Sequence, residues 1–221
     1  MEYIDICKKR TYTGSIHAST SSEDDNTQAA NILLEKGYWC SKKRPAPIKE
    51  SVTVDYGKTV AVDYIRLEPS SNGTAAFPNS FRIESSIDGN EWNVLYSETG
   101  TSLTANDHEI FIPLILLRYL KLVITDPAVM NSSYYSEIGK MEAGLYGLTS
   151  ITSSSSVSGS EPEKLLSPAA SDHWESEPKE AGVRETLKID LGRIYCVNRI
   201  LMVPGLDGFP DSFHVETSVD E

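Results

Sequence analysis

The chain has few of the residues that build metal sites and disulfide frameworks. Its 221 residues include three cysteines and four histidines. The cysteines, Cys7, Cys40 and Cys196, are odd in number and lack the spacing of a zinc site. No run of apolar residues approaches the roughly 20 that a membrane-spanning helix needs. The sequence therefore argues against a disulfide-stapled domain, a cysteine zinc site and a membrane-spanning helix.

Positively charged residues are also fewer than negatively charged ones. The chain has 20 Lys and Arg against 32 Asp and Glu, which gives a formal net charge of −12. Phosphate backbones and anionic lipids attract Lys and Arg, so we expect no nucleic-acid partner, and the charge disfavours a membrane partner. Residues 1–7 lack the basic-then-apolar order of a secretion signal. The cysteine usage fits an intracellular or bacterial origin better than a disulfide-stapled animal ectodomain.

Familiar catalytic patterns are missing as well. The histidines are dispersed and form no His-x-x-x-His or His-Glu-x-x-His pair, and neither a Gly-x-Ser-x-Gly elbow nor a glycine-rich phosphate loop occurs. Acidic residues are plentiful, but nothing in the sequence places two of them at the separation that a glycosidase needs. We expect the chain not to be an enzyme.

What the chain does contain is an internal repeat. Moving residues 16–69 forward by 135 positions superimposes identical residues without a gap, and after a shorter loop residues 77–84 match residues 209–216. A period this long indicates whole domains rather than the turns of a solenoid. We expect a lead-in over residues 1–12, a domain over 13–148, and the N-terminal half of a second domain over 149–221. The identical pairs include Ile16 and Ile151, Trp39 and Trp174, Glu50 and Glu185, Asp55 and Asp190, and Gly57 and Gly192.

The hydrophobic pattern is that of β-strands. Residues 51–56 alternate polar and apolar side chains, and residues 186–191 repeat the pattern in the same phase. A short segment at 29–35 has a helical pattern. Many short strands separated by turn residues predict an all-β, antiparallel sandwich or jelly roll. Further strands are expected at residues 62–67, 80–85, 92–96, 108–112, 118–125 and 141–146.

Several of these segments together resemble a known family, the discoidin or coagulation factor 5/8 type C domain. The resemblance implies an eight-stranded jelly-roll β-sandwich whose loops at one end bind a ligand, closest in style to carbohydrate-binding module family 32. It covers nearly all of the first copy. The segments that carry it are Ala30–Leu34, Tyr38–Ser41, Val54–Lys58, Phe77–Ser86, Asp88–Trp92, Arg118–Leu122 and Glu142–Gly147.

Several signature residues have structural explanations. Large aromatic residues on strands are more often core than binding platform, and Trp39, Trp92, Phe81 and Tyr119 are expected there. Asp55 precedes a glycine by two positions and is expected to fix a turn through backbone N–H groups.

The candidate ligand site is a set of loop residues. Tyr134 and Tyr135 lie among Ser and Asn residues, which suits an aromatic platform under a sugar ring; the alternative is that one tyrosine packs beneath the loop. Lys43 and Arg44 follow the tryptophan motif and could donate hydrogen bonds to an acidic sugar or a carboxylate, or form a solvated basic loop. Asn72 could contact a ligand hydroxyl.

The resemblance also raises the question of calcium. Family members commonly hold the ion with an Asp-Gly pair before the tryptophan and an acidic residue in the last strand. The acid is present as Glu142, but residues 34–37, Leu-Glu-Lys-Gly, stand in place of the Asp-Gly pair. Calcium with Glu142 as a ligand therefore stays one possibility.

These observations predict a non-catalytic binding module that recognises a cell-surface glycan or a polysaccharide, which favours an extracellular or cell-surface location. The alternative is a protein-protein interaction or scaffold domain in a larger assembly with further domains, and a lipid reader comes third. Half a sandwich leaves strand edges without partners, so residues 151–221 are expected to be loosely packed or completed by another chain.

Overall fold

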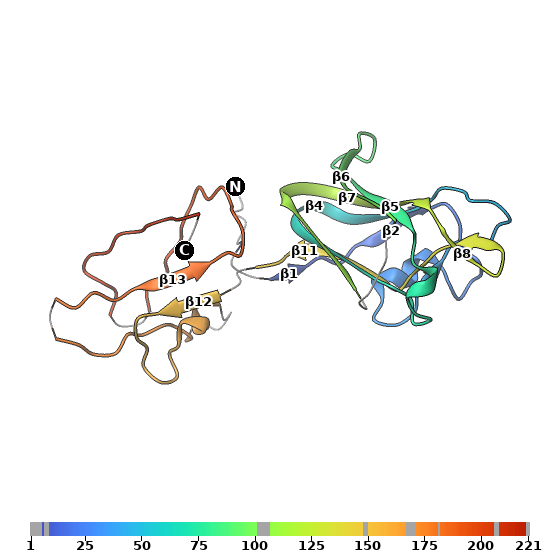
Figure 1. Ribbon diagram of the computed structural model, residues 1–221. Helices are drawn as coiled ribbons and strands as arrows, with labels where there is room; N and C mark the ends of the chain where they lie inside the picture. The colour runs from blue at the N-terminus through green and yellow to red at the C-terminus, as the bar shows by residue number, and fades with distance from the viewer. Residues whose placement is uncertain are drawn as a thin grey trace. The chain divides into compact units, whose positions relative to one another are not determined.

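The computed structural model describes residue 6 and residues 9–100, 107–147, 150–166, 171–180, 182–205 and 208–219. The chain forms two compact units, and the division falls between Tyr146 and Gly147 (Figure 1). We call residues 10–146 the first domain and the residues from Gly147 onward the second unit. No helix in the described residues is long and apolar enough to cross a membrane.

The first domain is built almost entirely of antiparallel strands, which confirms the predicted fold class. The segment expected to be helical is a short 3-10 helix. In chain order the elements are β1 (Arg10–Thr11), β2 (Ser15–Ser19), η1 (Ala29–Leu33), β3 (Trp39–Cys40), β4 (Glu50–Glu68), η2 (Thr74–Ala76), β5 (Ser80–Ser86), β6 (Asn93–Thr99), β7 (His108–Asp126), β8 (Ala128–Met130), β9 (Ser133–Tyr135), β10 (Glu137–Ile138) and β11 (Lys140–Leu145).

The longest strands of the sheet are β4 and β7, with 19 residues each. The sheet order is β1-β11-β4-β7-β5-β6, with β2 added to β4. The first half of β4 pairs with β2 and its second half with β11, while β5 pairs with the second half of β7. Each long strand was expected as two separate strands. They are continuous because register shifts near Gly57 and Pro113 let them bend without ending.

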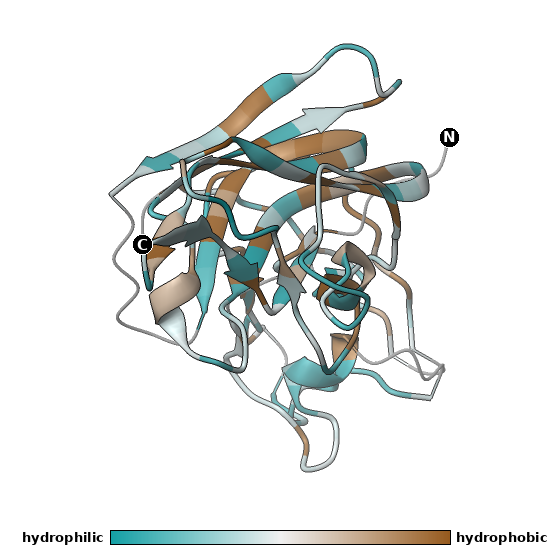
Figure 2. Cartoon of the chain, turned by 90° about the vertical axis from the view of Figure 1, so that its right-hand side faces the viewer, coloured by the Kyte–Doolittle hydropathy of each residue, from teal (hydrophilic) through white to brown (hydrophobic). Residues whose placement is uncertain are grey.

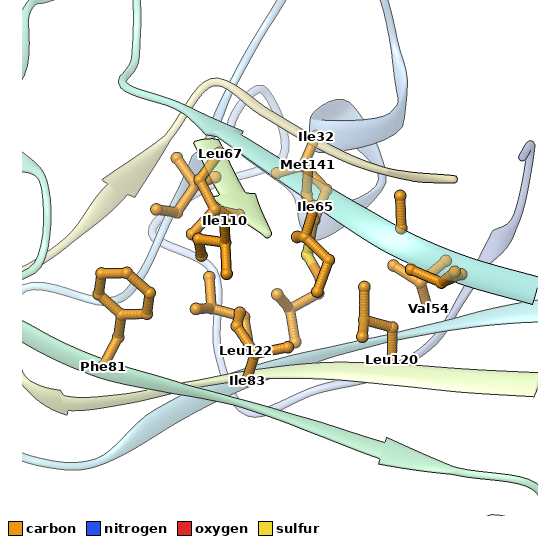
Figure 3. Close-up of a cluster of buried hydrophobic side chains, with 14 of the residues drawn as sticks. Ile32, Val54, Ile65, Leu67, Phe81, Ile83, Ile110, Leu120, Leu122 and Met141 are labelled. Carbon is orange, nitrogen blue, oxygen red and sulfur yellow. The ribbon is translucent and has the colours of Figure 1, made fainter. Parts of the chain in front are cut away.

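The core lies between two layers of side chains that these strands supply (Figure 3). Phe81, Ile83, Leu120 and Leu122 face Ile65, Leu67, Ile110 and Met141 across it. Burying this many large apolar side chains is the main contribution to the stability of the fold.

The aromatic residues expected in the core divide into two groups. Trp39, Phe81 and Tyr119 are buried, as predicted, and the indole N–H of Trp39 donates to the carbonyl of Ser21 at 2.8 Å. Trp92 differs, because it stays partly exposed. Its ring faces the ammonium of Lys121, which lies 3.3 Å from the ring centroid. A tryptophan covered by a lysine can remain at the surface, since the cation is attracted to the ring face.

Asp55 fixes the bend in β4, as expected from its position before Gly57. Its Oδ1 accepts the backbone N–H of Gly57 at 2.7 Å, and Gly57 has a φ of 72°, which suits glycine. The guanidinium of Arg118 on β7 donates to both carboxylate oxygens at 2.9 Å. These bonds, above all those from Arg118, hold the pKa of Asp55 below its usual value.

The second unit contains two strands and one short helix among its described residues. They are β12 (Ser150–Ser153), η3 (Pro162–Leu166) and β13 (Leu187–Asp190), and β12 pairs with β13 antiparallel. β13 lies where the alternating pattern predicted a strand. In the described part of residues 191–219 no strand is assigned, and the apolar side chains there are mostly exposed.

The bend at Asp55 gives the first prediction. Asp55→Asn is expected to lower the melting temperature of the first domain by about 5 °C at pH 7, because the paired charge is lost. The pKa of Asp55 is depressed on folding, so its contribution is present at neutral pH and disappears as the pH falls below about 4. Thermal unfolding followed by circular dichroism from pH 2 to 7 measures both effects.

The matched control is Arg118→Gln alone and combined with Asp55→Asn. If the pair acts as a unit, the double variant loses little more than either single variant. Two results would contradict this role. One is that the losses in melting temperature of the two single variants add up in the double variant. The other is that the melting temperature of Asp55→Asn falls at acid pH as steeply as that of the unaltered protein.

Candidate functional site

Loops from distant parts of the chain gather at the end of the first domain where the β8–β9 hairpin lies (Figure 1). Figure 2 looks onto the chain from this side. The loop before β4 joins the hairpin through a backbone bridge: Arg44 N donates to Tyr134 O at 3.1 Å, and Tyr134 N to Arg44 O at 2.9 Å. The Asn79 side chain donates to Pro127 O at 3.1 Å. The loop end is therefore a connected surface.

The β8–β9 hairpin presents one tyrosine and buries the other. Its two turn residues, Asn131 and Ser132, have φ values of 51° and 62°, the left-handed conformation that a tight two-residue hairpin requires. Successive residues of a strand point to opposite sides. Tyr134 is partly exposed, whereas Tyr135 is buried at 8% exposure.

Tyr135 packs beneath the loops in a small apolar cluster. The sequence had left open that one of the two tyrosines packs there. Its hydroxyl donates to the Met130 sulfur at 3.4 Å, and the ammonium of Lys43 lies 5.2 Å from its ring centroid. Tyr134 is thus the tyrosine of the pair that can offer a ring face to a ligand. The cluster contains Cys40, Ala76 and Tyr135, with Tyr38 and Met130 packed against it.

A buried carboxylate, Glu50, holds the basic loop in place. It accepts the Nε–H of Arg44 at 3.2 Å and also bonds the Thr20 hydroxyl. Removing one partner of such a buried pair is costly, because the remaining charge loses its compensation. Arg44 is therefore fixed in position beside Tyr134, and this ion pair does not use the other N–H donors of its guanidinium.

A second buried carboxylate, Glu137, was not anticipated from the sequence. The hydroxyl of Ser70 donates to it at 2.5 Å and the side-chain amide of Asn72 at 3.0 Å. Asn72 itself is exposed. This contact fixes the orientation of the Asn72 amide, and its carbonyl oxygen is not used in it. A two-residue strand such as β10 has too little pattern to reveal a buried acid.

Cys40 is a free cysteine whose thiol is buried at the loop end, in the same cluster as Tyr135. Burial raises its pKa to about 12, and the nearby Glu137 carboxylate adds to the effect. The thiol is therefore protonated at neutral pH and a poor nucleophile.

The expected calcium ligand, Glu142, lies on β11 and already forms ion pairs with Lys140 and Arg66. Lys140 Nζ is 2.9 Å from Glu142 Oε1 and 3.2 Å from Glu35 Oε1, and Arg66 Nη1 is 3.6 Å from Glu142 Oε2. An ammonium thus joins the 34–37 loop to the last strand. Calcium requires a shell of oxygen ligands, and no group of three or more candidate metal-binding side chains occurs in the described residues. These residues do not fit a calcium ion.

The first domain is thus an antiparallel sandwich with polar and aromatic loop residues gathered at one end. The F5/8 type C domain family matches residues 15–139, and the chain belongs to this family. No curated protein matches the chain.

The fold is similar to that of several solved carbohydrate-binding modules. Module CBM32-3 of a family 31 glycoside hydrolase from Clostridium perfringens is 17% identical with a TM-score of 0.54, over 60% of this chain and 90% of that one. CpGH89CBM32-5 from C. perfringens, in complex with GalNAc-β-1,3-galactose, is 14% identical with a TM-score of 0.53, over 61% and 99%. The family 32 module of C. perfringens NanJ, in complex with galactose, is 15% identical with a TM-score of 0.50, over 62% and 98%.

The pairing of Glu142 predicts that the first domain does not depend on calcium. Adding millimolar calcium or a chelator is expected to change its melting temperature by less than about 1 °C, because an ion that does not bind the folded state cannot stabilise it. Lys140→Met, which removes the ammonium between two carboxylates, is expected to lower the melting temperature. A rise of several degrees with calcium in the unaltered protein would show that the ion binds.

The burial of Cys40 predicts selective thiol chemistry. In the native protein at pH 8, iodoacetamide should modify the exposed Cys196 and leave Cys40 unmodified, because the Cys40 thiol is buried and protonated. In urea both should react. Peptide mass spectrometry after timed alkylation measures this, and rapid native labelling of Cys40 would show that the loop end opens.

Proposed function

We propose that the first domain is a non-catalytic carbohydrate-binding module whose ligand contacts the loop end. One observation carries the proposal: a backbone bridge pairs Arg44 with the partly exposed Tyr134 at the loop end. A pyranose offers a C–H face to an aromatic ring and hydroxyls to nearby polar groups. Membership of the family and the likeness to carbohydrate-binding modules support this class of ligand.

Each loop residue has a separate role in the proposal. Tyr134 stacks on the sugar ring, while Arg44 and Lys43 donate hydrogen bonds to its oxygens. Asn72, whose amide is oriented by Glu137, contacts a hydroxyl. Tyr135 supports the hairpin from beneath. The glycan belongs to a cell surface or a polysaccharide, and the net negative charge of the chain favours a neutral sugar over a polyanion.

The proposal requires no catalytic group at the loop end. The two buried carboxylates there are both engaged, Glu50 with Arg44 and Glu137 with Ser70 and Asn72. In the proposal both carboxylates hold loop residues in place, and neither is given a role in proton transfer. Binding without turnover is therefore the function that this arrangement supports best.

The test is a glycan array probed with the full chain, followed by titration calorimetry on any sugar that binds. Tyr134→Ala is expected to weaken binding about tenfold or more, through loss of the stacking face. Tyr134→Phe keeps the ring and should bind within about twofold of the unaltered protein. Circular dichroism confirms that both variants are folded.

Two results would count against the glycan proposal. One is equal affinity of Tyr134→Ala and the unaltered protein for the same sugar, which would place the site elsewhere. The other is a blank array with folded protein, which would favour a protein partner instead and lead to affinity capture.

A further inference from the structure

The partly exposed tyrosine of the β8–β9 hairpin lies in the middle of a row of three residues. Val129 of β8 pairs directly with Tyr134 of β9. On the other side of β9, the backbone bridge pairs Tyr134 with Arg44. Residues directly opposite each other in antiparallel strands project their side chains to the same side. The side chains of Val129, Tyr134 and Arg44 therefore share one face, and we call these three residues the surface row.

The hydrogen bonds show how close Val129 and Tyr134 lie. The backbone N–H and carbonyl of Tyr134 are both bonded to Arg44, at 2.9 and 3.1 Å. They point away from β8, so Val129 and Tyr134 form the non-hydrogen-bonded type of antiparallel pair, in which opposite side chains are closest. The Cβ atoms of directly opposite residues are about 4.5–5.5 Å apart. The valine methyl groups thus lie next to the tyrosine side chain.

The opposite face of the hairpin is the packed one. Ala128 and Tyr135 form the next pair and are both buried, and Met130 packs in the same cluster as Tyr135. Val129, in contrast, is 54% exposed, and the side chain of Arg44 is 32% exposed. The surface row therefore presents an apolar group, an aromatic ring and a guanidinium to solvent, in that order.

An exposed valine on a strand can be explained without a ligand, because β-branched residues favour strands. Val94 on β6 is such a residue, since it is 57% exposed and stands opposite the buried carboxylate of Glu84. Val129 differs from it in its partner. It stands opposite the partly exposed Tyr134 and extends the surface of that ring with further apolar atoms.

The order of the surface row constrains a sugar that stacks on Tyr134. One edge of the sugar ring lies toward Arg44, whose guanidinium donates hydrogen bonds to hydroxyl groups. The opposite edge lies toward Val129, whose side chain can neither donate nor accept a hydrogen bond. A hydroxyl pressed against the valine loses water without a replacement bond, which is unfavourable. A methyl group in the same place buries apolar surface on both molecules, which is favourable.

We propose that Val129 is a specificity-determining residue that selects sugars with a methyl group on the edge away from Arg44. The proposal rests on the proposed glycan function of the loop end and names the class of ligand. Two kinds of sugar carry such a group. One is an N-acetylhexosamine, through the methyl of its acetamido group, and the other is a 6-deoxyhexose, through its C6 methyl.

The test compares sugars that differ in one group, by NMR titration of the full chain. N-acetylglucosamine and N-acetylgalactosamine are each compared with the N-formyl sugar, which lacks only the methyl carbon, and L-fucose is compared with L-galactose. The methyl-bearing member of at least one pair is expected to bind about fourfold more tightly, the factor for burial of one methyl group. Preference in an acetamido pair identifies an N-acetylhexosamine, and preference in the fucose pair identifies a 6-deoxyhexose.

Three variants make the result specific to the valine. Val129→Thr keeps the branched shape but replaces a methyl with a hydroxyl, and it should reduce the preference to less than about twofold without weakening the sugar that lacks the methyl. Val129→Ile keeps an apolar side chain and should retain the preference. Val94→Thr makes the same change at an equally exposed valine of β6 and should have no effect. Circular dichroism confirms that each variant is folded.

Saturation-transfer NMR on the unaltered protein gives a readout that needs no variant. The methyl protons of the preferred sugar are expected to be among the most strongly saturated, because they lie against the valine. Saturation confined to the ring protons would overturn the proposal.

Two further results would overturn it and leave the glycan function intact. One is equal binding of both members of every pair, and the other is an unchanged preference in folded Val129→Thr. If no sugar binds the folded chain, the glycan function itself fails, and the role of Val129 fails with it.

Discussion

The pairing of β4 with β7 is the constraint on which the rest of the first domain depends. These two strands bring the inward side chains of both layers together; β2 and β11 pair with β4, β5 pairs with β7, and β6 is attached through β5. The β4–β7 ladder stays continuous across two register shifts, one between Asp55 and Val60 and one between Val62 and Tyr64. Asp55 and Arg118 join the strands beside the first shift with two charge-assisted hydrogen bonds.

Two buried carboxylates hold residues of the loop end in place. Glu50 fixes Arg44, and Glu137 fixes Asn72 through contacts with neutral donors. Buried acids are tolerated because each accepts hydrogen bonds from the loop it holds. These contacts hold the surface in one arrangement, which would limit the entropy lost if a ligand binds there. Lys140 plays a comparable part at Glu142, where an ammonium joins two carboxylates.

Two modules in one chain would also affect binding strength. If the repeat in residues 149–221 belongs to a second domain of the same fold, the two copies differ in their loops. Lys179 stands where Arg44 stands in the first domain, so the two copies should not share one specificity. Linked modules raise the effective concentration of the second site once the first is occupied, without tightening either site.

The sequence by itself determined the fold class, the family, the repeat and the turn at Asp55. These follow from local patterns: alternation of period two, a carboxylate two residues before glycine, and identical residues at a fixed offset. Tertiary structure decided that Tyr134 is exposed and Tyr135 buried, that Trp92 stays at the surface, that Arg44 lies beside Tyr134, and that Glu142 is paired with Lys140 and Arg66. It also revealed Glu137, which no motif marked. All of these depend on contacts between residues far apart in the chain, and only folding brings such residues together.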